Sequence, residues 1–180
     1  MQESKLKNYL LLHLIVFIWG FTAILGALIS IEAIPLVWYR MGLASIIILI
    51  YLLVKKRGLK IDNKAIIKFL FSGIIIAFHW ITFFKAIKVS NVSVALVTMS
   101  TGAFFTSLIE PIFFKRKIKL IEIIFGLIVI LGLYIIFNFE SQYSFGIIYA
   151  LISSFLGSLF AVLNGLYIKT HKANIISFYQ

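Results

Sequence analysis

The sequence predicts an all-α integral membrane protein, a polytopic bundle of about six transmembrane helices, and two observations carry this prediction. Hydrophobic residues make up 62% of the 180 positions and charged residues only 13%, against about 45–50% and about 25% in soluble domains. Apolar runs of about 20 residues, long enough to cross a bilayer as helices, occur six times. None shows the strict alternation of barrel strands. The runs are residues 9–29, 35–54, 66–87, 92–114, 120–137 and 145–168.

The connections between the runs alternate in charge. All but three of the 17 basic residues lie before the first run or around every second connection after it. The opposite connections hold Glu32 and Glu140, with Lys85 and Lys88 nearby. The positive-inside rule therefore predicts a multi-pass inner-membrane protein with its N-terminus in the cytoplasm. The net charge of +11 reflects this topology, so we expect the lipid bilayer, and no nucleic acid, as a partner.

Small residues recur at a spacing of four along the last run. Such residues let helix backbones approach each other in lipid, where no hydrophobic drive exists between helices. We interpret this stripe as a helix-packing face. Its members are Ser153, Gly157, Ala161 and Gly165.

The run 92–114 carries a stripe that is both small and polar. A polar face on a membrane helix must look at protein or at water, so we expect this single helix to line a cavity. Pro111 removes a helical hydrogen bond and predicts a kink near the end of the same helix. The stripe consists of Thr98, Gly102, Thr106 and Glu110.

Two of the ionisable residues within other runs are candidates for a functional role, Arg40 and His79. Arg40 is about one turn inside its run, where its side chain can snorkel to the interface or face a solute. His79 lies near the middle of the run 66–87, and its imidazole is too short to reach either membrane surface. Two interpretations stay open for His79: a hydrogen bond across helices, or a place on a water-filled pathway with a proton-handling role.

The sequence lacks the signatures of an enzyme. It has no cysteine and only six acidic residues, and it contains no His-Glu-x-x-His, Gly-x-Ser-x-Gly or glycine-rich phosphate motif. We therefore expect no catalytic residues, no metal and no cofactor. An intramembrane transferase, and a non-transporting membrane scaffold that dimerises through the run 145–168, remain as alternatives.

Several short motifs, in their order and spacing, resemble the EamA-type family of the drug/metabolite transporter superfamily. Two features depart from the family pattern. The Gly-Glu pair usual at the end of the fourth helix is replaced by Arg116 and Lys117, and the small-Pro step within that helix is absent. The matching pieces are Trp19-Gly20-Phe21, Pro35 followed by Arg40, the stretch Ala86-Ile87-Lys88-Val89-Ser90-Asn91-Val92-Ser93-Val94-Ala95, and Gly126 with Gly132.

The resemblance implies a ten-helix fold of two five-helix repeats in opposite orientations, with the substrate near the midplane between them. On this basis, residues 1–139 form a first repeat and residues 140–180 begin a truncated second repeat. The implied function is a secondary transporter, a permease that exports small metabolites such as amino acids or related solutes by alternating access. The missing C-terminal helices of the same protein, or a second copy in a homodimer, would complete the fold.

We expect the substrate pathway to combine aromatic, cationic and small polar side chains. His79 and Glu110 are the candidates for coupling transport to an ion. The cations Arg40, His79 and Lys85 favour a carboxylate-bearing or zwitterionic solute. The expected pathway residues are Trp19, Gly20, Arg40, His79, Trp80, Thr98, Gly102 and Thr106.

Overall fold

The computed structural model describes the backbone of residues 2–180 and the side chains of all of these except 2–5 and 136. The basic side chain of Lys5, counted above, therefore lies outside the described residues. No strand occurs within residues 2–180. The helices are α1 (Gln2–Leu28), α2 (Ala33–Val54), α3 (Asn63–Val89), α4 (Val92–Met99), α5 (Gly102–Phe114), α6 (Leu120–Phe139), the short 3₁₀ helix η1 (Ser141–Tyr143), α7 (Ser144–Tyr167) and α8 (Ala173–Tyr179).

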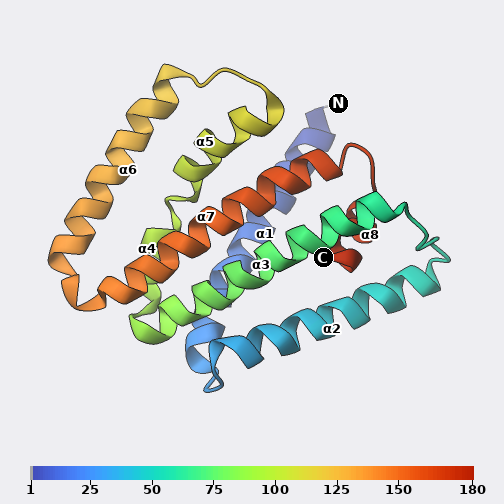
Figure 1. Cartoon of the computed structure of the whole chain (residues 1–180), viewed down its shortest axis with the longest axis horizontal. Coiled ribbons are helices and arrows are strands. Elements are labelled where there is room, and N and C mark those ends of the chain that lie inside the picture. The colour runs from blue at the N-terminus through green and yellow to red at the C-terminus, as the bar shows by residue number, and fades with distance from the viewer. Residues whose placement is uncertain (1) are drawn as a thin grey trace.

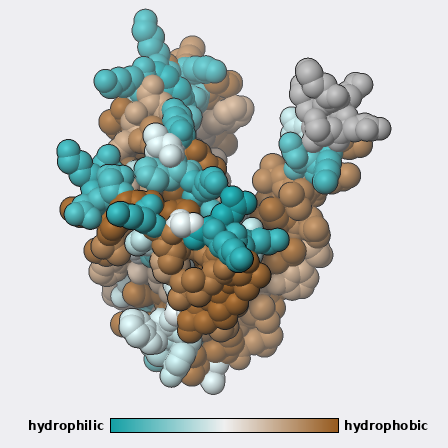
Figure 2. Space-filling view, turned by 90° about the vertical axis from the view of Figure 1, so that its right-hand side faces the viewer, coloured by the Kyte–Doolittle hydropathy of each residue, from teal (hydrophilic) through white to brown (hydrophobic). Residues whose placement is uncertain are grey.

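Six helical stretches of the described chain are long and apolar enough to cross a membrane, which confirms the predicted fold class. Their ends differ from the apolar runs by a few residues. Figure 2 shows hydrophobic side chains covering much of the molecular face, with hydrophilic side chains gathered toward one end. The stretches are Leu6–Leu28, Ala33–Val54, Asn63–Val89, Val92–Phe114, Leu120–Phe139 and Ser141–Tyr167.

Helices α3 and α7 form the centre of the bundle and share its most extensive interface (Figure 1). Their close approach depends on Gly146, because a Cβ atom there would overlap the side chain of Ser90. Helices α4 and α5 pack on α7, whereas α1, α2 and α8 contact α3. Helix α6 lies at the edge and packs on α5, where Gly126 faces the ring of Phe104.

The fourth span differs from the sequence prediction, because it is two helices rather than one. Helix α4 ends at Met99 and α5 begins at Gly102. At the break, the Ser100 hydroxyl donates to the Val97 carbonyl at 2.6 Å, and the Thr101 hydroxyl lies 2.8 Å from the Thr98 carbonyl, within reach of the same kind of bond. Such local bonds from Ser and Thr side chains compete with regular helix bonding. The interruption therefore lies at residues 100–101, and α5 runs helically through Pro111.

The C-terminal helix α8 folds back against the end of the bundle that carries the basic connections. Ile175 and Ile176 are buried, and Ile176 packs in a cluster with Ala65 and Phe69 of α3. The Tyr179 hydroxyl donates to the Leu59 carbonyl at 2.9 Å, which ties α8 to the α2–α3 connection.

Phe84 of α3 is the point at which α1 joins the bundle. Its side chain is 1% exposed, and a Cβ atom at Gly26 of α1 would overlap its ring. Ala23, one turn earlier on α1, is also buried in this cluster, whereas residues 6–21 of α1 are exposed. The absence of a side chain at Gly26 therefore fixes the distance between α1 and α3.

We expect Gly26→Ala to destabilise the protein by about 1–3 kcal/mol, because the added methyl group overpacks a buried ring that has no room to move. Thermal unfolding of the purified protein in detergent measures the effect. Gly20→Ala is the matched control in the same helix, since no atom lies within 4 Å of a Cβ atom at that position. Equal melting temperatures for the two variants would contradict this account of the α1–α3 contact.

Candidate functional site

His79 and Ser153 join the two central helices through reciprocal hydrogen bonds in the interior of the bundle. The His79 Nδ1 atom lies 2.8 Å from the Ser153 carbonyl oxygen, and the Ser153 hydroxyl donates to the His79 carbonyl at 2.9 Å. A carbonyl oxygen only accepts, so Nδ1 carries a proton and donates. In the neutral ring this leaves Nε2 as an acceptor. Of the two interpretations of His79, the structure therefore shows the first, a hydrogen bond across helices.

Aromatic rings and a glycine close around the His79 imidazole. Its ring centroid lies 4.9 Å from that of Trp80 in an edge-on arrangement and 6.3 Å from that of Phe83 in a stacked one. On the α7 side, a Cβ atom at Gly157 would come within 2.8 Å of Nδ1. Gly157 therefore allows α7 to approach the ring closely, so two members of the predicted packing stripe, Ser153 and Gly157, contact His79.

The rest of the packing stripe does not meet α3. Gly165 faces the ring of Phe114 in α5, and a Cβ atom at Gly165 would lie 3.3 Å from that ring. Ala161 is exposed on the surface of the described chain. Helix α7 therefore presents different members of the stripe to different neighbours.

A second polar contact joins α7 to the break between α4 and α5. The Ser154 hydroxyl donates to the Met99 carbonyl at 3.1 Å, and the Ser158 hydroxyl donates to the Gly102 carbonyl at 2.9 Å. The Thr101 hydroxyl donates to the Ser154 hydroxyl oxygen at 2.9 Å, and Ser154 donates its own proton to the Met99 carbonyl. The first bond gives the Met99 carbonyl, at the end of α4, a partner that water cannot supply in a bilayer. The second ties Gly102, at the start of α5, to α7.

Ser154 and Ser158 are not among the residues predicted from the sequence. The signal that could have found them is the pair of adjacent serines at 153 and 154 followed by a third serine four residues later, on an otherwise apolar helix. Hydroxyls at such positions need partners on neighbouring helices. One serine of the pair faces α3 and the other faces the break.

Thr98 differs from the other hydroxyl residues of the break. Its side chain is completely buried, and its hydroxyl oxygen has no hydrogen-bond partner among the described residues. Gly102 faces α7, where a Cβ atom would lie 3.3 and 3.5 Å from the hydroxyl oxygens of Ser154 and Ser158. Thr106 is half-buried one turn further along α5. The structure thus places Thr98 and Gly102 at the break itself.

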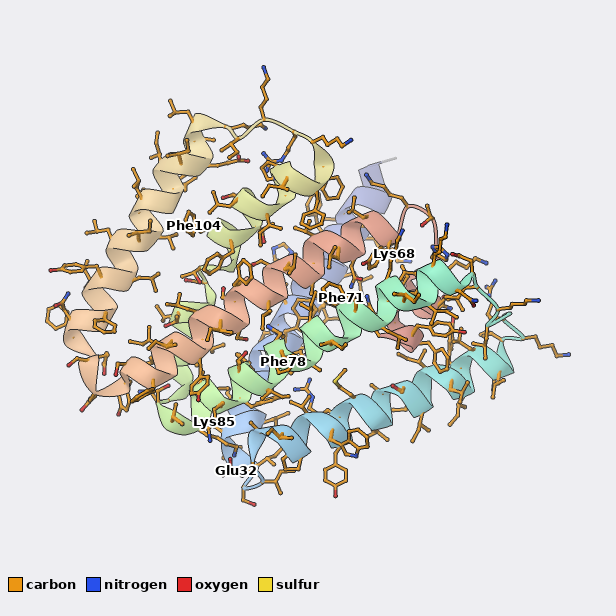
Figure 3. All side chains as sticks on the ribbon, viewed as in Figure 1. Glu32, Lys68, Phe71, Phe78, Lys85 and Phe104 are labelled. Carbon is orange, nitrogen blue, oxygen red and sulfur yellow. The ribbon has the colours of Figure 1, made fainter. Side chains whose placement is uncertain are left out.

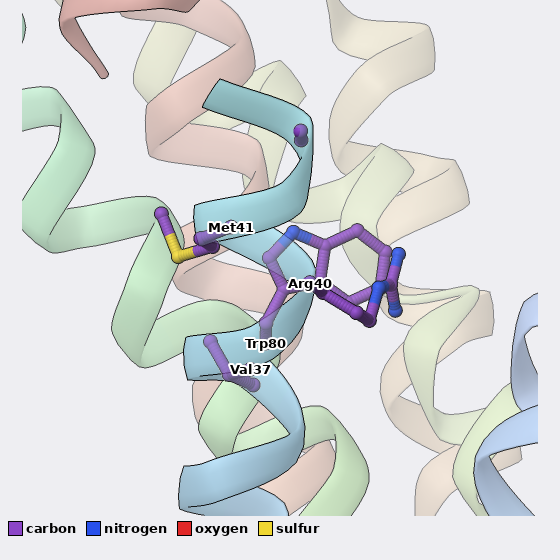
Figure 4. A pocket seen from close by; sticks show the side chains of 5 residues that line it. Val37, Arg40, Met41 and Trp80 are labelled. Carbon is purple, nitrogen blue, oxygen red and sulfur yellow. The ribbon is translucent and has the colours of Figure 1, made fainter. Parts of the chain in front are cut away.

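Arg40 lies over the aromatic residues on the other side of α3. Its guanidinium carbon is 4.4 Å from the ring centroid of Trp80 and 5.1 Å from that of Phe84. Figure 4 shows Arg40 and Trp80 at a small pocket of about 120 Å³, which is lined by Val37, Arg40, Met41, Ala44 and Trp80. The structure therefore brings together Arg40, Trp80 and His79 from the predicted pathway.

Two predicted pathway residues lie apart from this group. Trp19 is 69% exposed on α1, and a Cβ atom at Gly20 would have no neighbouring atom within 4 Å. Both residues precede the segment of α1 that contacts Phe84. The described structure therefore does not bring them to Arg40, Trp80 or His79.

Glu110 lies at the end of α5 that carries basic connections, where Arg116 holds it. The Arg116 guanidinium is 3.0 Å from the Glu110 carboxylate and 2.9 Å from that of Glu122, which lies in the first turn of α6. The hydrogen bond to Glu122, and next that to Glu110, raises the pKa of Arg116 above its usual value. The acid of α5 thus has a structural partner that links it to α6.

The other end of the bundle carries a separate ion pair. Lys85 Nζ lies 3.9 Å from a carboxylate oxygen of Glu32, and both side chains are exposed. Figure 3 shows Glu32 and Lys85 at this end and Lys68 at the opposite end of α3. No group of three or more His, Cys, Asp or Glu side chains that could hold a metal occurs in the described part of the chain.

The apolar spans and the polar groups between them define the class of the molecule as a multi-pass α-helical membrane protein. The sequence model of the EamA-like transporter family matches residues 6–138, and the chain belongs to this family. It is therefore a transporter of the drug/metabolite type, in a family whose members are generally not enzymes. No curated protein and no solved structure matches the chain.

We expect Ser153→Ala to lower the stability of the protein by about 1 kcal/mol, because it removes a buried hydroxyl that bonds α3 to α7. Chemical or thermal unfolding in detergent measures the loss. Ser100→Ala is the control, since the exposed Ser100 hydroxyl bonds only within its own turn. A loss for Ser100→Ala as large as that for Ser153→Ala would contradict the assigned role.

Proposed function

We propose that the protein is a secondary transporter that exports small metabolites, such as amino acids or related organic solutes, by alternating access. The observation that carries this proposal is the broken fourth span. Transporters commonly bind solutes and ions beside discontinuous membrane helices, whose freed backbone groups need polar neighbours. Here the break lies against the serines of α7, close to the helix pair that holds His79.

The proposed pathway follows the polar side of α4 and α5 and the aromatic side of α3. Thr98 supports it most directly, since a completely buried hydroxyl without a partner calls for an explanation. A solute or water that reaches the break in another conformation would supply the missing bond. The proposed residues of this pathway are Arg40, His79, Trp80, Thr98, Gly102 and Thr106, with His79 and Glu110 proposed for coupling. Trp19 and Gly20 stay in the proposal only for a conformation or an assembly that covers the exposed part of α1.

The proposed architecture places residues 1–139 in one five-helix repeat and residues 140–180 at the start of another. An odd number of spans inverts the second repeat relative to the first. The substrate would lie near the midplane between the two repeats. The proposed location is the inner membrane, with the basic connections in the cytoplasm.

Transport is tested in liposomes that hold the purified protein and a mixture of labelled amino acids. We expect Thr98→Val to reduce flux about tenfold while melting temperature and membrane abundance stay unchanged, because the lost hydroxyl has no partner in the resting structure. Thr82→Val is the control, since its hydroxyl bonds carbonyls of its own helix. Unchanged flux in Thr98→Val would remove Thr98 from the pathway, and absence of any flux would contradict the proposed function.

The orientation is tested by single cysteines, which suit a chain without natural cysteine. We expect Glu140→Cys to react with a membrane-impermeant thiol reagent in intact cells and Lys56→Cys to react only after the cells are opened, because the basic connections stay in the cytoplasm. The reverse labelling pattern would overturn the proposed orientation. Labelling both variants in opened cells controls for reactivity.

A further inference from the structure

The guanidinium group of Arg40 lies against aromatic rings and has no polar partner among the described residues. The rings of Trp80 and Phe84 stack at 5.7 Å with an angle of 21°, and the Arg40 guanidinium lies over both. Phe84 is itself packed against Gly26 of α1, so this platform is fixed within the bundle. A guanidinium that stacks on aromatic rings keeps its N–H groups in its plane, pointing away from the contact.

These N–H groups have no partner in the described structure. Among the described residues, Arg40 forms neither an ion pair nor a hydrogen bond, whereas Arg116 forms both with Glu110 and Glu122. The acid nearest to the same end of α2, Glu32, pairs with Lys85 instead. Arg40 therefore presents five free donors in a planar fork, the geometry that matches a carboxylate or phosphate.

The depth of Arg40 argues against a side chain that only extends to the membrane–water interface. Arg40 is seven residues into α2 and Trp80 is nine residues from the end of α3, so their Cα atoms lie about 10 and about 14 Å from those helix ends. The guanidinium lies over the rings of Trp80 and Phe84. A charged group held at this depth costs free energy unless an anion or water accompanies it.

The pocket beside Arg40 has room for a small organic anion. Its volume is about 120 Å³, against about 10–15 Å³ needed to hold one water. Apart from Arg40, its walls are the side chains of Val37, Met41, Ala44 and the indole of Trp80 (Figure 4). A cationic edge beside an aliphatic wall fits a carboxylate that carries a short apolar chain.

We infer that Arg40 and Trp80 form a binding site for the carboxylate of the solute that the protein transports. The inference deepens the proposed function and rests on it only for the identity of the ligand as a transported solute. Arg40 donates two parallel hydrogen bonds to the carboxylate, and Trp80 holds the guanidinium plane in position. Lipid phosphate has the same oxyanion chemistry, so the experiment separates the two sources.

The test is binding of isovalerate and isovaleramide to the purified chain in phosphatidylcholine nanodiscs, measured by saturation-transfer NMR. The two probes share size and shape, and only isovalerate carries a charge. We expect isovalerate to bind saturably and about tenfold more tightly than isovaleramide, because only the anion uses both donors. Arg40→Gln abolishes this preference and Arg40→Lys reduces it. The control Lys88→Gln retains it, because that lysine bonds the Ile29 carbonyl and lies outside the site.

Three outcomes would overturn the assignment. The first is equal binding of the two probes to the unaltered protein, and the second is an unchanged preference in Arg40→Gln. The third is the absence of isovalerate binding together with Arg40-dependent retention of phosphatidylglycerol in native mass spectrometry, which identifies a lipid site. Circular dichroism and melting temperature show whether each variant is folded, and Arg40→Lys provides a second variant if Arg40→Gln is not.

The result is distinguishable from failure of the proposed function. Flux of solutes without a carboxylate, unchanged in Arg40→Gln, would overturn the carboxylate site and leave transport standing. Arg40-dependent binding of isovalerate by a protein that moves no solute would support the site and contradict transport.

Discussion

The structure depends on one constraint of the bilayer, which is that backbone groups within a membrane must find their partners inside the protein. The fourth span breaks this pattern at residues 100–101, and the serines of α7 make the break tolerable. Ser154 and Ser158 bond the carbonyls of Met99 and Gly102. The interruption of the fourth span therefore depends on the serines of α7, and those serines find their hydrogen-bond partners at the interruption.

Helix α7 also fixes the opposite side of the bundle, because Ser153, the neighbour of Ser154, bonds His79 of α3. The His79 ring contacts the Trp80 ring, and the Arg40 guanidinium lies over the Trp80 ring. A continuous set of contacts thus leads from the break, across α7 and α3, to a cation on α2. A movement of α7 relative to α3 would therefore change the contacts at the break and those of Arg40 together. Alternating access requires such a coupled movement of helices.

The sequence predicts the spans well, because hydropathy and the absence of water as a partner in lipid leave helices as the only choice. It also led to the family from motifs around Trp19, Pro35 and residues 86–95. It did not predict the break, since local bonds from Ser100 and Thr101 interrupt a helix only when a neighbour satisfies the freed carbonyls. The positions of single side chains also depend on neighbouring helices. The sequence therefore could not show that Trp19 and Gly20 lie on an exposed face, or that Arg40 packs on Trp80.

The central claim, that α7 holds the broken fourth span through its hydroxyls, is tested most directly by a double-mutant cycle between Thr101 and Ser154. Thr101→Val, Ser154→Ala and the double variant are compared by unfolding in detergent. The 2.9 Å contact between the two hydroxyls predicts that the double variant loses less stability than the two single losses added, by about 0.6–1.7 kcal/mol. Strictly additive losses would contradict the claim.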